Sequence, residues 1–167
     1  PDAIIVIVGN KSGVSYGRQP PEGTSWKDIF LDEIKGQYDK SRVCFTGHMR
    51  YTEYIQLLQL SACHVYLTYP FVLSWSLLES MSSSLPIVAS ATSPVKEVIQ
   101  HGKTGLLIDF FSSDELVGAV SNILNDRKLA ERLGSEARAH ILKNFSLEQC
   151  LPSHLSLIKL VASGVLP

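Results

Sequence analysis

Residues 69–90 read YPFVLSWSLLESMSSSLPIVAS, in which a loop, a helix and a strand follow one another. After an aromatic loop, the stretch near 74–83 has helical character and carries a single acid, Glu79, among leucines and a methionine. A proline then ends the helix, and the apolar run at 86–90 predicts a buried strand. One carboxylate among apolar residues, with serine hydroxyls around it, marks the start of this helix as a candidate site.

The same alternation of strands and helices continues along the chain. Alternating elements form parallel sheets through right-handed crossovers, so we expect an α/β fold, a Rossmann-like parallel sheet with helices on both faces. The first run, AIIVIVG at 3–9, is apolar throughout and predicts a strand buried on both faces. Further strands are predicted at 42–47, 64–69, 86–90 and 104–110, and helices at 26–38, 52–62, 74–83, 93–102, 113–125, 127–145 and 147–162.

Residues typical of helix ends support several of these ranges. The candidates are Ser25 as an N-cap, Gly102 as the end of the helix 93–102, and two capping boxes, Ser112 with Glu115 and Ser146 with Gln149.

The 167 residues favour a single domain, 1–167, which ends in the helices of 127–162. A net charge of -1 argues against a nucleic-acid-binding surface and against a polybasic membrane-binding face. No apolar run is long enough to span a bilayer. The chain starts with proline close to its first strand, so we expect a domain excised from a longer protein.

Three cysteines, Cys44, Cys63 and Cys150, follow no metal-binding or disulfide pattern. We therefore expect buried free thiols, a reducing compartment and a cytoplasmic protein.

The loops after the strands exclude three common α/β classes. The first strand is followed by GNKSG, which supplies neither the G-x-G-x-x-G of a dinucleotide fold nor a P-loop. A phosphoacceptor receiver domain would need acids after the first and third strands, and this chain has Gly9-Asn10 and Tyr69-Pro70 there.

In parallel α/β sheets, ligands bind beyond the carboxyl ends of the strands. There, the free N–H groups at the start of the helix near 74–83, those of Leu73, Ser74 and Trp75, would favour an anion such as a diphosphate. Glu79, one turn inside, would repel phosphate but could accept hydrogen bonds from the two vicinal hydroxyls of a ribose. The alternative is that Glu79 caps a neighbouring loop or pairs with a Lys or Arg.

The loop after the second strand also reaches this edge. Gly47 would allow close backbone approach, His48 is the histidine that lies on the ligand edge, Met49 could pack on a flat base, and Arg50 could meet a phosphate or a base edge. The alternative is a plain turn with a solvated arginine.

The long polar loop 9–25 follows the first strand. It carries Lys11, Tyr16 and Arg18, which could contact phosphate or an acceptor in the cleft. A solvated loop is the alternative.

Three segments together resemble the C-terminal, donor-binding domain of family 4 retaining glycosyltransferases of the GT-B type. ESMSSSLPIVAS at 79–90 is similar to the end of the family's E-x-F-G-x-x-x-x-E-A-M-A-x-G-x-P-V-V run. RVCFTGHM at 42–49 and SPVKEVIQHGKTGLLIDFFSSDEL at 93–116 resemble two further family motifs. The resemblance covers residues 3–150 and implies that the chain is one half of a GT-B fold.

By this resemblance, Glu79 is the second acid of the family's E-x7-E pair and would bind the donor ribose. Phe71 stands where the family has the first acid, which contacts the donor sugar. The family's site would also include, for the diphosphate and sugar, the backbone of Leu73, Ser74 and Trp75, and, for the base, Gly47, His48, Met49 and Arg50.

Other departures from the family pattern concern glycines. Ser74, Ser84 and Ser93-Pro94 replace family glycines, so this chain either binds its donor differently or binds it more weakly. The family's diphosphate-clamping Arg and Lys and its N-terminal acceptor domain are expected to lie outside this chain. We therefore assign no catalytic residue within this domain.

The resemblance implies transfer of a sugar from a nucleotide-diphosphate sugar to an acceptor, with retention, by a hexosyltransferase-type enzyme. The resemblance also implies that neither a metal nor a cofactor is needed, and the sequence has no D-x-D motif to hold a metal. The isolated domain is expected to be inactive alone, and its partners are the nucleotide-diphosphate sugar and its own N-terminal domain. The alternatives are a nucleotide-binding or scaffold domain that has lost transfer, and a GT-B sugar-nucleotide epimerase.

The last helix, 147–162, has apolar residues at helical spacing: Leu147, Leu151, Leu155 and Ile158. In the family this helix often contacts the other domain, which would explain the face; packing within this domain is the alternative.

Overall fold

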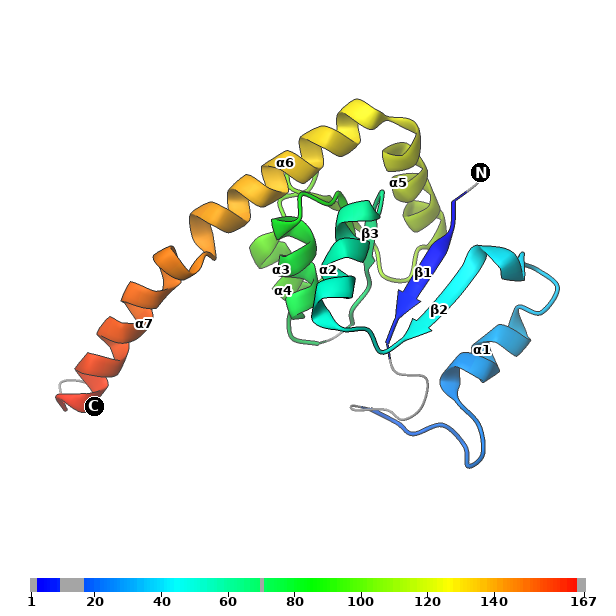
Figure 1. Ribbon diagram of the computed structural model, residues 1–167, viewed down its shortest axis with the longest axis horizontal. Helices are drawn as coiled ribbons and strands as arrows, with labels where there is room; N and C mark the ends of the chain where they lie inside the picture. Colours follow the sequence, from blue (N-terminus) through cyan, green and yellow to red (C-terminus); the bar gives the residue numbers. More distant parts are fainter. Residues whose placement is uncertain (1–2, 10–16, 70, 165–167) are drawn as a thin grey trace. The chain divides into compact units, whose positions relative to one another are not determined.

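The computed structural model describes residues 3–9, 17–69 and 71–164. The chain forms two compact units, 1–54 and 55–167, and each is described by itself. Figure 1 shows the order of the helices and strands along the chain.

Among its described residues, unit 1 contains a parallel pair of strands and one complete α-helix. Strands β1 (Ile5–Val8) and β2 (Val43–Gly47) pair in parallel, with Ile5 opposite Val43. Helix α1 (Trp26–Glu33) lies between them in sequence, followed by a 3-10 turn, η1 (Lys40–Arg42).

The start of α1 is capped as predicted, but its end and the burial of β1 differ from expectation. The Ser25 hydroxyl accepts a hydrogen bond from the N–H of Asp28 at 3.1 Å. The helix ends at Glu33 rather than at 38, because Gly36 adopts a positive φ of 80° that a helix cannot continue through. All four β1 side chains are exposed, since unit 1 offers this strand one neighbouring strand and one helix.

Unit 2 is built on a second parallel sheet, in the order β3 (His64–Tyr66), β4 (Ile87–Ser90) and β5 (Leu106–Ile108). Tyr66 pairs with Ala89, and Ala89 pairs with Leu107. The helices are α2 (Tyr51–Leu60), which begins in unit 1, α3 (Trp75–Ser82), α4 (Ser93–Val98), α5 (Ser113–Asn125), α6 (Arg127–Asn144) and α7 (Leu147–Ala162).

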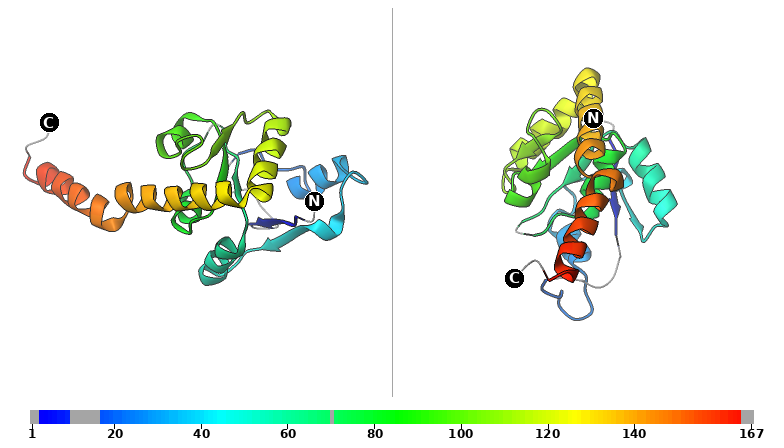
Figure 2. Two further views of the ribbon diagram at one scale, coloured as in Figure 1. Left: turned by 90° about the horizontal axis from the view of Figure 1, so that it is seen from above. Right: turned by 90° about the vertical axis from the view of Figure 1, so that its left-hand side faces the viewer.

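Side chains of the central strand β4 alternate between two hydrophobic clusters. Ile87 and Ala89 pack with Leu77 and Met81 of α3 and with residues of α4 and α6. Val88 packs on the other side with residues of β5, α5 and α6. All four β4 residues are buried, as expected of a strand covered on both faces. The predicted α/β class, parallel sheets flanked by helices, is confirmed (Figure 2).

The predicted end of the helix 93–102 is corrected. Helix α4 ends at Val98, because Ile99 turns to an extended conformation and enters the core. Gly102, with φ of 74°, therefore lies in the following turn and does not close the helix.

The capping boxes form only in part. The Ser112 hydroxyl accepts from the N–H of Glu115 at 3.2 Å, but the Glu115 carboxylate accepts from the N–H of Asp109 at 2.8 Å instead of from Ser112. Ser146 makes no side-chain cap to α7.

The last two helices differ in burial. Four residues of α6 are buried, whereas α7 has none, so its leucines and isoleucine are exposed. The apolar face predicted on this helix is therefore present, and it does not pack within the described part of unit 2.

The cysteines are free thiols, as predicted, but they are not all buried. Cys44 on β2 is exposed, while Cys63 and Cys150 are half-buried. Burial raises the pKa of the Cys63 thiol to about 12, which makes it unreactive at neutral pH.

Candidate functional site

The start of α3 is fixed by hydrogen bonds from the strand beside it. The Ser74 hydroxyl accepts from the N–H of Ser76 at 3.3 Å, and the N–H of Ser74 donates to the phenol oxygen of Tyr66 at 2.9 Å. The Tyr66 ring is buried in the core. The strand end therefore holds the helix start in place. The N–H of Ser74, which the sequence predicted to be free for an anion, is instead used by Tyr66. The sequence analysis did not identify Tyr66, because nothing in its strand context distinguishes a tyrosine that packs from one that anchors a loop.

The loop that leads to α3 is also held by hydrogen bonds from a side chain at the end of a neighbouring strand. Ser90, at the end of β4, donates its hydroxyl to the carbonyl of Thr68 at 2.9 Å and accepts from the N–H of Thr68 at 3.0 Å. Ser90 is fully buried. This side chain replaces backbone pairing beyond Tyr66, which explains why β3 is shorter than the predicted 64–69 strand.

Glu79 lies in the second turn of α3 and is half-buried. Its neighbours Leu77 and Met81 are fully buried in the core, and Ser80 donates its hydroxyl to the carbonyl of Ser76 at 2.7 Å. Among the residues that the structure describes, the Glu79 carboxylate has no hydrogen-bond or ion-pair partner. Neither alternative for Glu79, a loop cap or a pair with Lys or Arg, is formed there.

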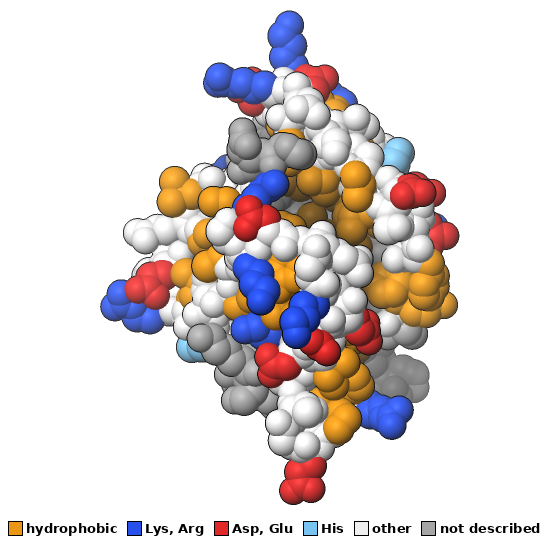
Figure 3. All heavy atoms as spheres, turned by 90° about the vertical axis from the view of Figure 1, so that its right-hand side faces the viewer, with side chains coloured by type: hydrophobic (Ala, Val, Ile, Leu, Met, Phe, Trp, Pro, Cys, Tyr) orange, Lys and Arg blue, Asp and Glu red, His pale blue; other side chains and the backbone are white. Residues whose placement is uncertain are grey.

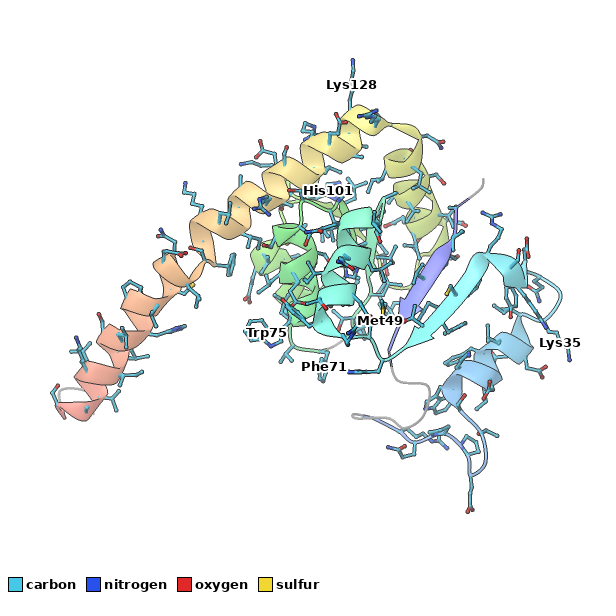
Figure 4. All side chains as sticks on the ribbon, viewed as in Figure 1. Lys35, Met49, Phe71, Trp75, His101 and Lys128 are labelled. Atoms are coloured by element: carbon cyan, nitrogen blue, oxygen red, sulfur yellow. The ribbon has the colours of Figure 1, made fainter. Side chains whose placement is uncertain are left out.

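Aromatic side chains lie around this helix start. Trp75, the first residue of α3, is 79% exposed, and Phe71 in the preceding loop is 51% exposed. Figure 4 shows the Trp75 ring outside the helix. Leu73 is half-buried and packs against the core of unit 2. The segment therefore presents two exposed aromatic rings, one of them, Phe71, at the position where the family pattern has an acid.

The predicted base-binding residues 47–50 lie in unit 1. Gly47 is buried with a φ of 74°, a conformation that glycine adopts without strain. His48 is exposed and Met49 is half-buried. Arg50 is hydrogen-bonded to Glu53: its side-chain Nε donates to the Glu53 carboxylate at 3.0 Å, and its backbone N–H donates to the same carboxylate at 3.2 Å. These bonds hold the pKa of Glu53 below its usual range.

In the 9–25 loop, Arg18 is exposed, and its carbonyl accepts from the indole N–H of Trp26 at 2.9 Å. Lys11 and Tyr16 lie outside the described residues. Over those residues, no cluster of three or more His, Cys, Asp or Glu side chains has metal-binding geometry. No helix within the described ranges is long and apolar enough to cross a bilayer.

Comparison with known proteins identifies the family. The model of the family "Glycosyl transferases group 1" matches residues 1–140. The chain belongs to this family.

Curated group 1 relatives match part of the chain. The N-acetyl-alpha-D-glucosaminyl L-malate synthase of Bacillus anthracis is 26% identical over 124 residues, which is 74% of this chain and 32% of the relative. A GDP-mannose-dependent alpha-(1-6)-phosphatidylinositol monomannoside mannosyltransferase of Mycobacterium tuberculosis is 36% identical over 61 residues, 36% of this chain and 16% of the relative. The chain thus spans about a third of the first relative's length and about a sixth of the second's.

Solved structures agree on the fold, that of GT-B glycosyltransferases. Anabaena HepE, in a crystal structure with UDP, superposes with a TM-score of 0.75 at 22% identity, covering 93% of this chain and 41% of HepE. Sucrose-phosphate synthase from Thermosynechococcus elongatus superposes with a TM-score of 0.71 at 23% identity, covering 95% and 38%.

Proposed function

We propose that this chain is the C-terminal, donor-nucleotide domain of a family 4 glycosyltransferase of the hexosyltransferase type. It acts in the cytoplasm, without a metal, and moves a sugar from a nucleotide-diphosphate sugar to an acceptor with retention of configuration. The N-terminal domain, which carries the rest of the acceptor site, belongs to the remainder of the protein, so this domain alone is inactive.

The observation that carries the proposal is the unpaired carboxylate of Glu79. A half-buried charge without a partner costs free energy unless something else satisfies it. A carboxylate accepts hydrogen bonds strongly, and two neighbouring ribose hydroxyls are donors placed to serve both of its oxygens. The stability lost at this position is then regained when the nucleotide binds.

The surroundings of Glu79 suit the rest of a donor. A diphosphate would lie at the start of α3, near Leu73, Ser74 and Trp75, where the helix dipole favours negative charge. The base contacts predicted for 47–50 belong to unit 1. HepE structures hold UDP and UDP-glucose, which supports a nucleotide-sugar donor for this chain as well.

The reaction needs positioning rather than a covalent protein group. The bond between the anomeric carbon and the diphosphate oxygen breaks, and the leaving diphosphate takes the electron pair. The acceptor hydroxyl oxygen bonds to the anomeric carbon on the same face, and its proton passes to the leaving phosphate oxygen. Holding the diphosphate in place and stabilising its developing charge are the contributions of this domain.

Phe71 favours a second candidate, a nucleotide-binding domain that has lost sugar transfer. The exposed ring stands where the family has an acid that contacts the donor sugar. A domain of this kind would bind UDP and UDP-glucose with equal affinity, whereas a donor site for glucose would bind them differently. Replacing Phe71→Glu should restore discrimination if this loop follows the path of the family.

The test is calorimetric titration of the chain with UDP, GDP and ADP. We expect one nucleotide to bind with millimolar or tighter affinity, and Glu79→Gln to weaken it by about 1–3 kcal/mol, because hydrogen bonds to a charged group are lost. Glu136→Gln on α6, also a glutamate and exposed, is the matched control and should bind as the parent does. Equal affinity in the parent and Glu79→Gln would remove Glu79 from the site.

A further inference from the structure

Unit 2 contains a hollow whose lining includes none of the residues assigned to the donor site. It has a volume of about 450 Å³ and opens beside the carboxyl ends of β4 and β5, next to the start of α4. Small-molecule sites have volumes of roughly 300–1,000 Å³, so the hollow is large enough for one or two sugar rings. It lies on the edge of the sheet where α/β proteins bind ligands.

Three aromatic rings form one wall of this hollow. Tyr69 stacks on Phe110 with ring centres 5.4 Å apart and planes at 27°, and it meets Phe111 edge-on at 5.3 Å. Phe110 and Phe111 are perpendicular at 5.0 Å. Tyr69 and Phe111 are 58% and 76% exposed. The cluster joins two loops distant in sequence, and its exposed rings would gain stability from a ligand that covers them.

Polar groups complete the lining. Thr92 is the N-cap residue of α4, but its hydroxyl caps nothing: the oxygen is buried and has no hydrogen-bond partner among the described residues. Lys96, one turn later, forms no ion pair with any described residue. The hollow thus has an unsatisfied hydroxyl and a free ammonium beside an aromatic wall.

Two carboxylates also face the hollow, and one oxygen of each accepts a hydrogen bond from the backbone of the loop 109–111. Glu115 Oε2 accepts from the N–H of Asp109, and Asp109 Oδ1 accepts from the N–H of Phe111, both at 2.8 Å. These bonds fix the loop that carries the phenylalanines. The other oxygen of each carboxylate accepts no hydrogen bond from any described residue and could bind a ligand.

We propose that this hollow binds a sugar ring of the acceptor, an inference that rests on the proposed transferase function. A pyranose has an apolar face of C–H groups, whose partial positive charge suits the negative face of an aromatic ring. Its rim of hydroxyls can donate to the carboxylates and accept from Thr92 and Lys96. Asp109 and Glu115 oppose a phosphate or another anion, and the polar lining opposes a plain hydrocarbon.

The position of the hollow identifies the sugar as acceptor rather than donor. Tyr69 lies two residues before Phe71, so the aromatic wall adjoins the loop that we assign to the donor sugar. Transfer requires the acceptor hydroxyl to approach the donor's anomeric carbon, and a sugar bound beside this loop meets that requirement.

The experiment is an NMR titration of the isotopically labelled chain with three probes: methyl α-D-glucopyranoside, methyl α-D-mannopyranoside and methyl N-acetyl-α-D-glucosaminide. We expect at least one to give saturable shifts at the amides of Lys96, Phe110 and Phe111. Phe111→Ala should weaken that binding at least tenfold. Phe30→Ala, which removes an exposed ring of unit 1, is the matched control and should not change it.

Thr92→Val separates a binding role from a structural one. The change keeps the shape and removes only the unpartnered hydroxyl, so the melting temperature should stay the same or rise while sugar affinity falls severalfold. The inference is overturned if none of the three probes gives saturable shifts at these amides, or if binding is the same in Phe111→Ala and Thr92→Val as in the parent.

Titration of the same samples with UDP, GDP and ADP keeps the two proposals apart. Nucleotide binding without sugar binding contradicts the acceptor site alone and leaves the proposed function in place. Sugar binding without nucleotide binding supports a sugar site in the hollow and contradicts the donor role of the chain.

Discussion

At the scale of single residues, Ser84 is the non-glycine residue with a positive φ among those described, at 60°. It lies between α3 and β4, where the family pattern has glycine. A β-carbon in this left-handed conformation is close to the following carbonyl oxygen, which costs about 1–2 kcal/mol relative to glycine. The serine therefore stores strain at the turn that joins the donor helix to the central strand.

We predict that Ser84→Gly stabilises the protein by about 1 kcal/mol, because it removes this strain at a modest cost in unfolded-chain entropy. Urea unfolding followed by circular dichroism measures the change. Ser153→Ala, at an exposed position of α7, serves as control and should change the stability by no more than about 0.5 kcal/mol, the difference in helix propensity between serine and alanine. A Ser84→Gly variant less stable than the parent would show that the serine side chain does something else here.

At the scale of elements, the contact between α6 and the α3–β4 turn depends on Gly134. A β-carbon built on Gly134 would lie 2.1 Å from the carbonyl oxygen of Ser84, far inside contact distance. Gly118, in the middle of α5, has nothing within 4 Å of the same position. The two glycines share a helical setting and differ only in what faces them.

Replacing each of these two glycines by alanine should change the stability in opposite directions. Gly134→Ala should destabilise the fold by about 3 kcal/mol or more, because the two elements must move apart. Gly118→Ala should stabilise it by up to about 1 kcal/mol, since alanine favours helix and meets no obstacle. Thermal unfolding of both variants checks the signs. If both were stabilising, the close approach of α6 to Ser84 would be contradicted.

Most helices and strands could be predicted from the sequence, but some of their ends and some site residues could not. Periodicity located every helix and strand of the described chain, and the start of α5 was predicted to the residue. The end of α1 was missed although Gly36, with its positive φ, is a local stop signal. The end of α4 was missed because Ile99 leaves the helix to enter the core, which depends on packing distant in sequence. Glu79 was identified as a candidate from its isolation among apolar residues. The roles of Tyr66 and Ser90 were not, because they depend on which loops the fold places beside them.

At the scale of the whole molecule, a half-buried histidine couples stability to pH. Burial lowers the pKa of His64 to about 4, and no described residue bonds its Nε2. In the unfolded chain the imidazole of this residue takes up a proton near pH 6.5, whereas in the folded chain it does so only near pH 4. The stability contributed by neutral His64 is fully present above pH 6.5 and is lost as the pH falls from 6.5 toward 4.

We predict that the free energy of unfolding falls by about 2 kcal/mol between pH 7.5 and pH 5 because of this histidine, at about 1.4 kcal/mol per pH unit below 6.5. Urea titrations at the two pH values measure it. His64→Phe keeps an aromatic ring and removes the titration, so most of the difference should disappear. An undiminished difference in that variant would assign the pH dependence to other groups.

The central claim is that Glu79 binds ribose hydroxyls, and a double-mutant cycle tests it most directly. The cycle combines the parent chain and Glu79→Gln with the tightest-binding of UDP, GDP and ADP and with the 2′-deoxy form of that nucleotide. Titration calorimetry gives the four affinities. The coupling between the two changes isolates the interaction of the carboxylate with the hydroxyl.

In the parent chain, we predict that the deoxy nucleotide binds at least about 10-fold more weakly than the ribose form, a difference of about 1.4 kcal/mol or more in binding free energy. In Glu79→Gln, the deoxy and ribose forms should differ by less than about 2-fold, because the partner of the hydroxyl has already been weakened. The same loss of affinity in both proteins would show that Glu79 does not contact the ribose, and would contradict the account.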